Sequence, residues 1–166
     1  MIRPARDLDA GALRAILSEF VETTIWMPRL HSRAEDISFA AKLIAGHSVF
    51  VWEADRPLGF IALHKNAIDA LYIRNYQHGQ GYGSALVHYA QSMRGELELW
   101  TFQQNTSARR FYTKHGFSEV KFTDGSGNDE GLPDVCLTWR AHLYERQKTI
   151  YNRTRRSNTN APPCRG

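Results

Sequence analysis

The chain has 166 residues, of which 42% are hydrophobic and 23% are charged, a length and mixture typical of one globular domain and not of a disordered chain. Its sequence has no apolar run near the roughly 18 residues that span a bilayer, and its first ten residues lack the hydrophobic core of a secretory signal. The two cysteines, Cys136 and Cys164, make neither a disulfide framework nor a metal-ligand cluster. We therefore expect a cytoplasmic protein without a metal site.

The net charge of +4 is unevenly distributed. Residues 140–166 hold seven basic residues against one acidic residue, a net charge of +6, so residues 1–139 carry −2. Basic segments attract nucleic acid or acidic surfaces, whereas polar termini are typically solvated. We predict a folded domain over residues 1–140 and a flexible basic extension over residues 141–166.

Periodicity in the first 46 residues predicts a short strand over residues 1–4 and then two helices. Asp7 or Asp9 is expected to cap the first helix. Pro28 interrupts the helical pattern. The segment Ser32–Glu35 has the pattern of a capping box, which starts the second helix.

From Ser48 onward the sequence alternates with the period of strands. In chain order we expect strands at 48–54, 58–65 and 67–73, a helix at 83–93, a strand at 97–102, a helix at 105–116, and strands at 117–124 and 134–140. This order predicts an α/β (α+β) fold. Its mixed, mostly antiparallel central sheet would have about six to seven strands, flanked by about four helices.

The most informative segment is a junction between a strand and a helix that contains Gly79, Gly81 and Gly83. Glycine lets a backbone approach a ligand, and the free N–H groups of a helix's first turn bind anions. The junction therefore predicts a site for a cofactor's diphosphate. It lacks the lysine that a Walker A loop has before Ser84, and the glycine or alanine that a dinucleotide fingerprint has at Ser84. A glycine-rich turn without a ligand is the alternative.

This junction, LYIRNYQHGQGYGSALVHYA over residues 71–90, resembles the cofactor-binding segment of the GCN5-related N-acetyltransferase family. The family pattern is Arg or Gln-x-x-Gly-x-Gly or Ala after a strand; Gly81 and Gly83 match it, and His78 stands at the Arg or Gln position. Residues 105–117 resemble the family's Asn…Ala…Phe or Leu-Tyr…Gly-Phe segment. The resemblance covers residues 2–139 and implies the family's fold.

The resemblance implies that an acetyl group moves from acetyl-CoA to an amine by direct attack in a ternary complex. Asn105 and Tyr112 are seven residues apart and so lie on one helix face, which suits the pantetheine arm and its sulfur. The implied acyl-CoA-binding residues are Leu71, Tyr72, Ile73, His78, Gly79, Gln80, Gly81, Tyr82, Gly83, Ser84, Asn105 and Tyr112.

Acyl transfer needs a donor for the developing oxyanion, an acid for the leaving thiolate and a base for the amine. The resemblance implies the N–H of Ile73 as the donor and Tyr112 as the acid. Asp69 is the candidate base, although a strand carboxylate is as often ion-paired or solvated. Weaker candidates for the base are Glu98, His64 and His31.

The acceptor site is expected in TIWMPRLH, residues 24–31, which would cover the cleft in this family. Trp26, Met27 and Pro28 would form an apolar wall, and Arg29 or His31 would contact a polar group; a hydrophobic loop that plugs the core edge is the alternative. The acceptor is expected to be a small amine or the N-terminal or lysine amine of a protein. We expect no membrane partner and consider a homodimer.

Two other functions are compatible with the same sequence. A catalytically silent module would bind acyl-CoA as a sensor. A nucleic-acid-associated protein would act through the basic residues of 141–166, although the sequence has no RNA-recognition motif.

Overall fold

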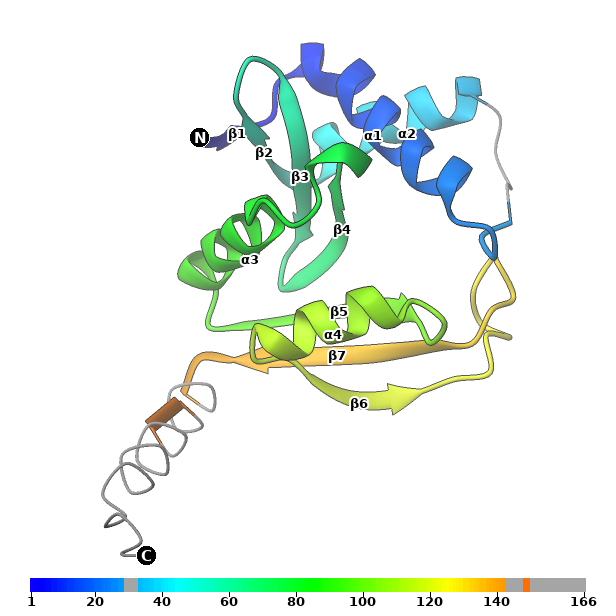
Figure 1. Cartoon of the computed structure of the whole chain (residues 1–166), viewed down its shortest axis with the longest axis vertical. Helices are drawn as coiled ribbons and strands as arrows, with labels where there is room; N and C mark the ends of the chain where they lie inside the picture. Colours follow the sequence, from blue (N-terminus) through cyan, green and yellow to red (C-terminus); the bar gives the residue numbers. More distant parts are fainter. Residues whose placement is uncertain (29–32, 143–147, 150–166) are drawn as a thin grey trace, which may run out of the picture.

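The computed structural model describes residues 1–28, 33–142 and 148–149, drawn in Figure 1. The strands are β1 (Ile2–Pro4), β2 (Ser48–Glu53), β3 (Pro57–His64), β4 (Ala67–Ile73), β5 (Glu96–Phe102), β6 (Ser118–Phe122) and β7 (Asp134–Arg140). The helices are α1 (Ala10–Thr23), α2 (Arg33–Gly46), α3 (Tyr82–Met93) and α4 (Thr106–Lys114), with short 3₁₀ turns η1 (Asp7–Asp9) and η2 (Asn75–Gln77). The predicted order of strands and helices is confirmed, and the two 3₁₀ turns are additions to it.

The strands form one mixed sheet in the order β1-β2-β3-β4-β5-β7-β6, in which only the β4–β5 pair is parallel. One hydrophobic core joins α1 and α2 to one face of β2, β3 and β4. A second core joins α3 and α4 to the other face. Because helices cover both of its faces, β3 is buried along almost its whole length.

The sheet opens between β4 and β5. The register pairs Ala67 with Glu98, and the N–H of Glu98 donates to the carbonyl of Asn66 at 2.9 Å. Beyond this point the two strands diverge, and Figure 1 shows the β1–β4 part and the β5–β7 part as two halves joined near the start of β4. Among the described residues, no residue of β4 beyond Ala67 is paired with β5.

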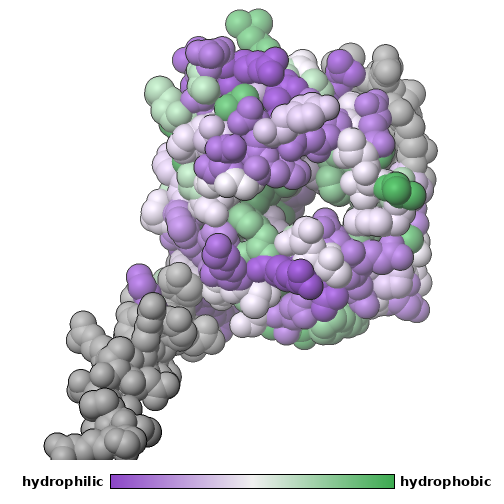
Figure 2. Space-filling view, viewed as in Figure 1, coloured by the Kyte–Doolittle hydropathy of each residue, from purple (hydrophilic) through white to green (hydrophobic). Residues whose placement is uncertain are grey.

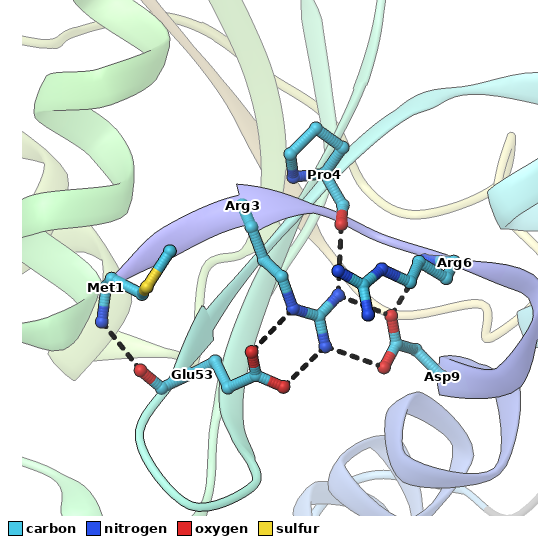
Figure 3. Close-up of polar contacts among 6 residues, drawn as sticks. All are labelled: Met1, Arg3, Pro4, Arg6, Asp9 and Glu53. Atoms are coloured by element: carbon cyan, nitrogen blue, oxygen red, sulfur yellow. Dashed lines mark hydrogen bonds and ion pairs between the residues drawn. The ribbon is translucent and has the colours of Figure 1, made fainter.

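Asp9 is the N-cap residue of α1, as predicted, but its side chain makes no cap hydrogen bond to that helix. Its carboxylate instead accepts bonds from the Arg3 guanidinium at 2.8 and 3.0 Å and from the N–H of Arg6 at 2.7 Å, as Figure 3 shows. Arg3 also binds Glu53 at 2.6 and 2.7 Å. These contacts fasten β1 to β2 and lower the pKa of both carboxyl groups.

Some predictions fall wholly or partly outside the described residues. They concern Ser32 of the expected capping box and most of the predicted basic extension, residues 143–147 and 150–166. Within the described ranges, no helix combines the length and the apolar character needed to cross a bilayer.

Candidate active site

A bulge in β4 changes which of its N–H groups face the opening in the sheet. Ala62 of β3 pairs with Ala70, and the next residue, Leu63, pairs with Ile68. Asp69 is therefore an extra residue without a partner in β3, which defines a β-bulge. Such a bulge reverses the alternation of hydrogen bonds along the rest of the strand.

After the bulge, the end of β4 directs two N–H groups away from β3. The N–H of Arg74 donates to the carbonyl of Leu58 at 2.8 Å, so it faces β3. Hydrogen-bonding directions alternate along an antiparallel pair. The N–H groups of Leu71 and Ile73 therefore face the opposite side, where β5 has already diverged. Ile73 thus has the orientation that an oxyanion donor needs.

The glycine loop presents main-chain N–H groups at the start of α3. Gly79 and Gly81 have φ angles of 78° and 84°, in the left-handed region that favours glycine. Gly81 is the N-terminal cap residue of α3. Within the described part of the chain, the N–H groups from Gly81 to Ser84 have no acceptor. Free N–H groups at a helix N-terminus fit a diphosphate.

Gly83 lies close to both α4 and the end of β4. A Cβ atom at this position would lie 3.4 Å from the ring of Phe111 in α4 and 3.7 Å from the side chain of Ile73, which are ordinary van der Waals contacts. The first turn of α3, with its free N–H groups, is therefore beside the opening in the sheet.

His78 binds the end of β4. Its Nε2 is 2.9 Å from the carbonyl oxygen of Ile73. Since a carbonyl only accepts, Nε2 carries the hydrogen in this contact. His78 thus fastens the glycine loop to the strand whose N–H groups face the opening.

Tyr112 lies in the core side of α4 with only 7% of its surface exposed. Its ring packs against Phe111 and Phe117, with centroids 5.2 and 5.4 Å away. Burial, and then the neighbouring Tyr72, raises the pKa of the Tyr112 phenol above its usual value. Because an ordinary phenol already has a pKa of about 10, the Tyr112 side chain carries its proton at neutral pH.

Asn105 is the N-terminal cap residue of α4. Its side-chain oxygen accepts a hydrogen bond from the N–H of Ala108 at 3.1 Å. This contact uses the oxygen for capping, and leaves the amide nitrogen for the predicted contact with pantetheine.

The candidate bases contact residues other than Tyr112. Asp69 binds His47 at 2.7 Å, and the ring of His47 lies 5.4 Å from that of His64. Glu98 and His64 are both exposed, and both line a separate depression of about 420 Å³ near the start of β4 and β5. His31 lies outside the described residues.

The predicted acceptor segment reaches across the opening. Trp26, which follows α1, contacts Phe102 at the end of β5 with ring centroids 5.7 Å apart. Met27 donates its N–H to the carbonyl of Thr24 at 3.1 Å, and Met27 and Pro28 are half-buried. Figure 2 shows this face hollowed between the two halves, with apolar atoms inside the hollow. Arg29 and His31 lie outside the described residues.

Sequence reasoning missed the side-chain environment of Tyr72. Its ring packs against Phe20 and Phe60 at 5.1 and 5.9 Å. Burial, and then the charge of Glu130, raises the pKa of Tyr72. Glu130 belongs to the loop between β6 and β7, and the side-chain nitrogen of Gln103 holds both ends of that loop at 2.9 and 3.0 Å. The sequence feature that could have indicated Glu130 is a carboxylate in a long glycine-rich loop, because long loops often carry functional residues.

The comparisons with known proteins agree with this geometry. Residues 45–119 match the family model described as an acetyltransferase (GNAT) domain. Over 118 residues the chain is 44% identical to the peptidyl-lysine N-acetyltransferase YjaB of Escherichia coli, covering 70% of this chain and 80% of the relative.

Two solved structures show the same fold. The solution structure of apo-form YjaB from Escherichia coli has a TM-score of 0.70 and 29% identity, and covers 84% of this chain and 96% of that one. The structure of yncA from Salmonella typhimurium with its cofactor acetyl-CoA has a TM-score of 0.65 and 19% identity, and covers 84% of this chain and 92% of that one. The predicted fold and family are thus confirmed, and the chain belongs to the GNAT acetyltransferase family.

Proposed function

We propose that this chain transfers the acetyl group of acetyl-CoA to the side-chain amine of a lysine in a polypeptide, and that residues 1–140 carry the activity. The observation that carries this proposal is a set of free main-chain N–H groups. They belong to Leu71 and Ile73 at the end of β4 and to residues 81–84 at the start of α3. The similarity to a peptidyl-lysine N-acetyltransferase over 80% of that relative supports the choice of acceptor.

The main chain supplies the first part of the chemistry. The N–H groups from Gly81 to Ser84 bind the diphosphate, aided by the dipole of α3. The N–H of Ile73 donates to the thioester carbonyl oxygen and stabilises the negative charge that develops there during attack. The side-chain amide of Asn105 contacts the pantetheine arm.

Tyr112 supplies the proton for the leaving sulfur. A thiolate leaves more readily when a neighbouring acid protonates it. The phenol of a tyrosine is protonated at neutral pH, and burial raises the pKa of Tyr112 further.

Two carboxylates serve the acceptor. A lysine amine is mostly protonated at neutral pH and must lose a proton before it attacks. Asp69, held by His47 at 2.7 Å, takes this proton directly or through water. Glu130 attracts the cationic side chain toward Tyr72, and Trp26 and Met27 contact its aliphatic part.

The test is a screen for release of CoA thiol with acetyl-CoA and three acceptors. The acceptors are a peptide with one lysine and a blocked N-terminus, the same peptide with arginine instead of lysine and a free N-terminus, and a small amine. The proposal predicts turnover on the lysine peptide and a mass increase of one acetyl group on its lysine. Turnover confined to the free N-terminus or to the small amine contradicts the proposed acceptor. Acetyl-CoA binding without turnover on any acceptor indicates the silent sensor.

A further inference from the structure

A cluster of polar contacts joins the two substrate-binding segments. Glu19, in the last turns of α1, accepts hydrogen bonds from the Arg74 guanidinium and, at 3.2 Å, from the N–H of Asn75. The side-chain amide of Asn75 donates to the carbonyl of Glu19 at 3.4 Å and to the hydroxyl of Thr23 at 3.3 Å. We call these four residues the α1–η2 brace.

The brace is also bonded to the neighbouring strand β3. Arg74 donates from its Nε to the carbonyl of Pro57 at 3.2 Å and from its main-chain N–H to Leu58 at 2.8 Å. The Arg74 side chain is 17% exposed and that of Glu19 is 30% exposed. Charge-assisted bonds that are partly shielded from water are stronger than ordinary surface ion pairs.

The brace lies between the two segments that are proposed to bind the substrates. On one side, α1 ends at Thr23 and leads directly into the acceptor segment with Trp26. On the other side, Arg74 follows Ile73, and η2 leads into the glycine loop that begins α3. A displacement of the glycine loop therefore reaches the acceptor segment through the contacts of the brace, beside the packing of Phe20 on Tyr72.

We propose that Glu19 is a positioning residue: through Arg74 and Asn75 it fixes the acceptor segment 24–28 relative to the glycine loop, so that CoA binding orders the acceptor segment. This inference rests on the proposed binding of acyl-CoA. Two sites linked in this way have a coupling free energy, and each ligand improves the affinity for the other. Glu19 itself touches neither substrate.

The experiment compares the wild-type chain with the variants Glu19→Gln and Asp9→Asn, using CoA as the probe and hydrogen exchange as the readout. Asp9→Asn is the matched control, because Asp9 forms a more buried ion pair, with Arg3, that contacts neither segment. CoA should slow exchange at residues 81–84 in all three proteins. It should slow exchange at residues 24–28 in the wild type and in Asp9→Asn, but not in Glu19→Gln.

A milder variant guards against loss of the fold. Asn75→Ala removes the two amide contacts and keeps the ion pair, so it should weaken the protection at 24–28 without abolishing it. In steady-state kinetics, Glu19→Gln should raise the KM for the lysine peptide by about tenfold, within the usual range of coupling between sites. Its affinity for acetyl-CoA should change far less.

The outcomes separate the two proposals. If CoA fails to protect residues 81–84 in the wild type, the proposed cofactor site is wrong, and this inference falls with it. If residues 81–84 are protected but 24–28 respond equally in the wild type and in Glu19→Gln, the cofactor site stands and the positioning role of Glu19 is overturned. That role is also overturned if neither protein responds at 24–28.

Discussion

The two walls of the proposed cleft differ in the groups that would bind the substrates. The proposed acyl-CoA wall consists of main-chain N–H groups from one continuous segment, residues 71–84, together with Tyr112 and Asn105. The proposed acceptor wall consists of side chains from distant segments, with Trp26 after α1, Phe102 at the end of β5 and Glu130 in the β6–β7 loop. A main-chain site depends on a local pattern of glycines, whereas a side-chain site depends on the whole fold. The sequence therefore indicates the first site as a whole, but of the second it indicates the segment with Trp26 and not the part with Phe102 and Glu130.

The largest effect should come from the side chain that serves the chemistry on the acyl-CoA wall. Tyr112→Phe removes the proton donor and keeps the packing of the ring. We expect kcat to fall by about 100-fold, in the range for loss of an acid–base group, with acetyl-CoA affinity unchanged by calorimetry. An unchanged kcat would remove Tyr112 from the mechanism.

The next effect tests whether the acyl-CoA wall depends on backbone conformation. Gly81→Ala forces a residue with a Cβ into the left-handed region, which costs roughly 1–2 kcal/mol, and should weaken acetyl-CoA binding by about tenfold. Gly95→Ala is the control, because Gly95 has neither a left-handed φ nor an atom within 4 Å of its Cβ position. Equal affinity in both variants, measured by calorimetry, would show that the φ angle of Gly81 has no role in binding.

Substitutions in the acceptor wall should change the KM for the peptide and leave the affinity for acetyl-CoA unchanged. Trp26→Ala removes the ring that contacts Phe102, and Glu130→Gln removes a charge without changing shape. Each should raise the KM for the lysine peptide by roughly fivefold, the size expected from loss of an exposed apolar or charged contact. Acetyl-CoA affinity should stay the same. A change in acetyl-CoA affinity without a change in peptide KM would reverse the assignment of the two walls.

The arrangement of strands and helices was predictable because periodicity and turn residues are local. The positive φ of Gly116 after α4 also agrees with the predicted helix end. The roles of single polar residues were less predictable. Asp9 has the sequence pattern of a cap, but Arg3 lies close enough to bind its carboxylate. A guanidinium competes effectively with a helix N–H for a carboxylate.

Long-range contacts explain the rest of the difference between prediction and structure. The bulge at Asp69 depends on the register of β3 and β4, and no residue pattern in β4 indicates it. The pairing of Asp69 with His47 joins residues 22 positions apart. The contact between Glu19 and Arg74 spans 55 positions. Such pairs follow from the folded arrangement of elements, which periodicity does not supply.

The smallest effect concerns stability and lies outside both walls. His115 is buried at the end of α4, and burial lowers the pKa of its imidazole below the unfolded value of about 6.5. The unfolded chain therefore binds this proton more readily than the folded chain. The contribution of His115 to stability is complete above pH 6.5 or so, and is lost as pH falls through the folded pKa.

The variant His115→Asn tests this pH dependence. It keeps a side-chain donor near the carbonyl of Phe111, which His115 Nδ1 contacts at 2.7 Å, and it removes the titration. Urea unfolding at pH 7.5 and pH 5 should show a smaller loss of stability in the variant than in the wild type. The same loss in both proteins would mean that His115 does not contribute to acid sensitivity.

The most direct test of the main-chain site is to map CoA binding by NMR on the 19.0 kDa chain. If these N–H groups hold the cofactor, the largest amide shifts on addition of CoA fall on Gly81 to Ser84 and on Leu71 and Ile73. Shifts confined to the depression lined by His64, Glu98 and Arg140, or no shifts at all, would contradict the proposed site.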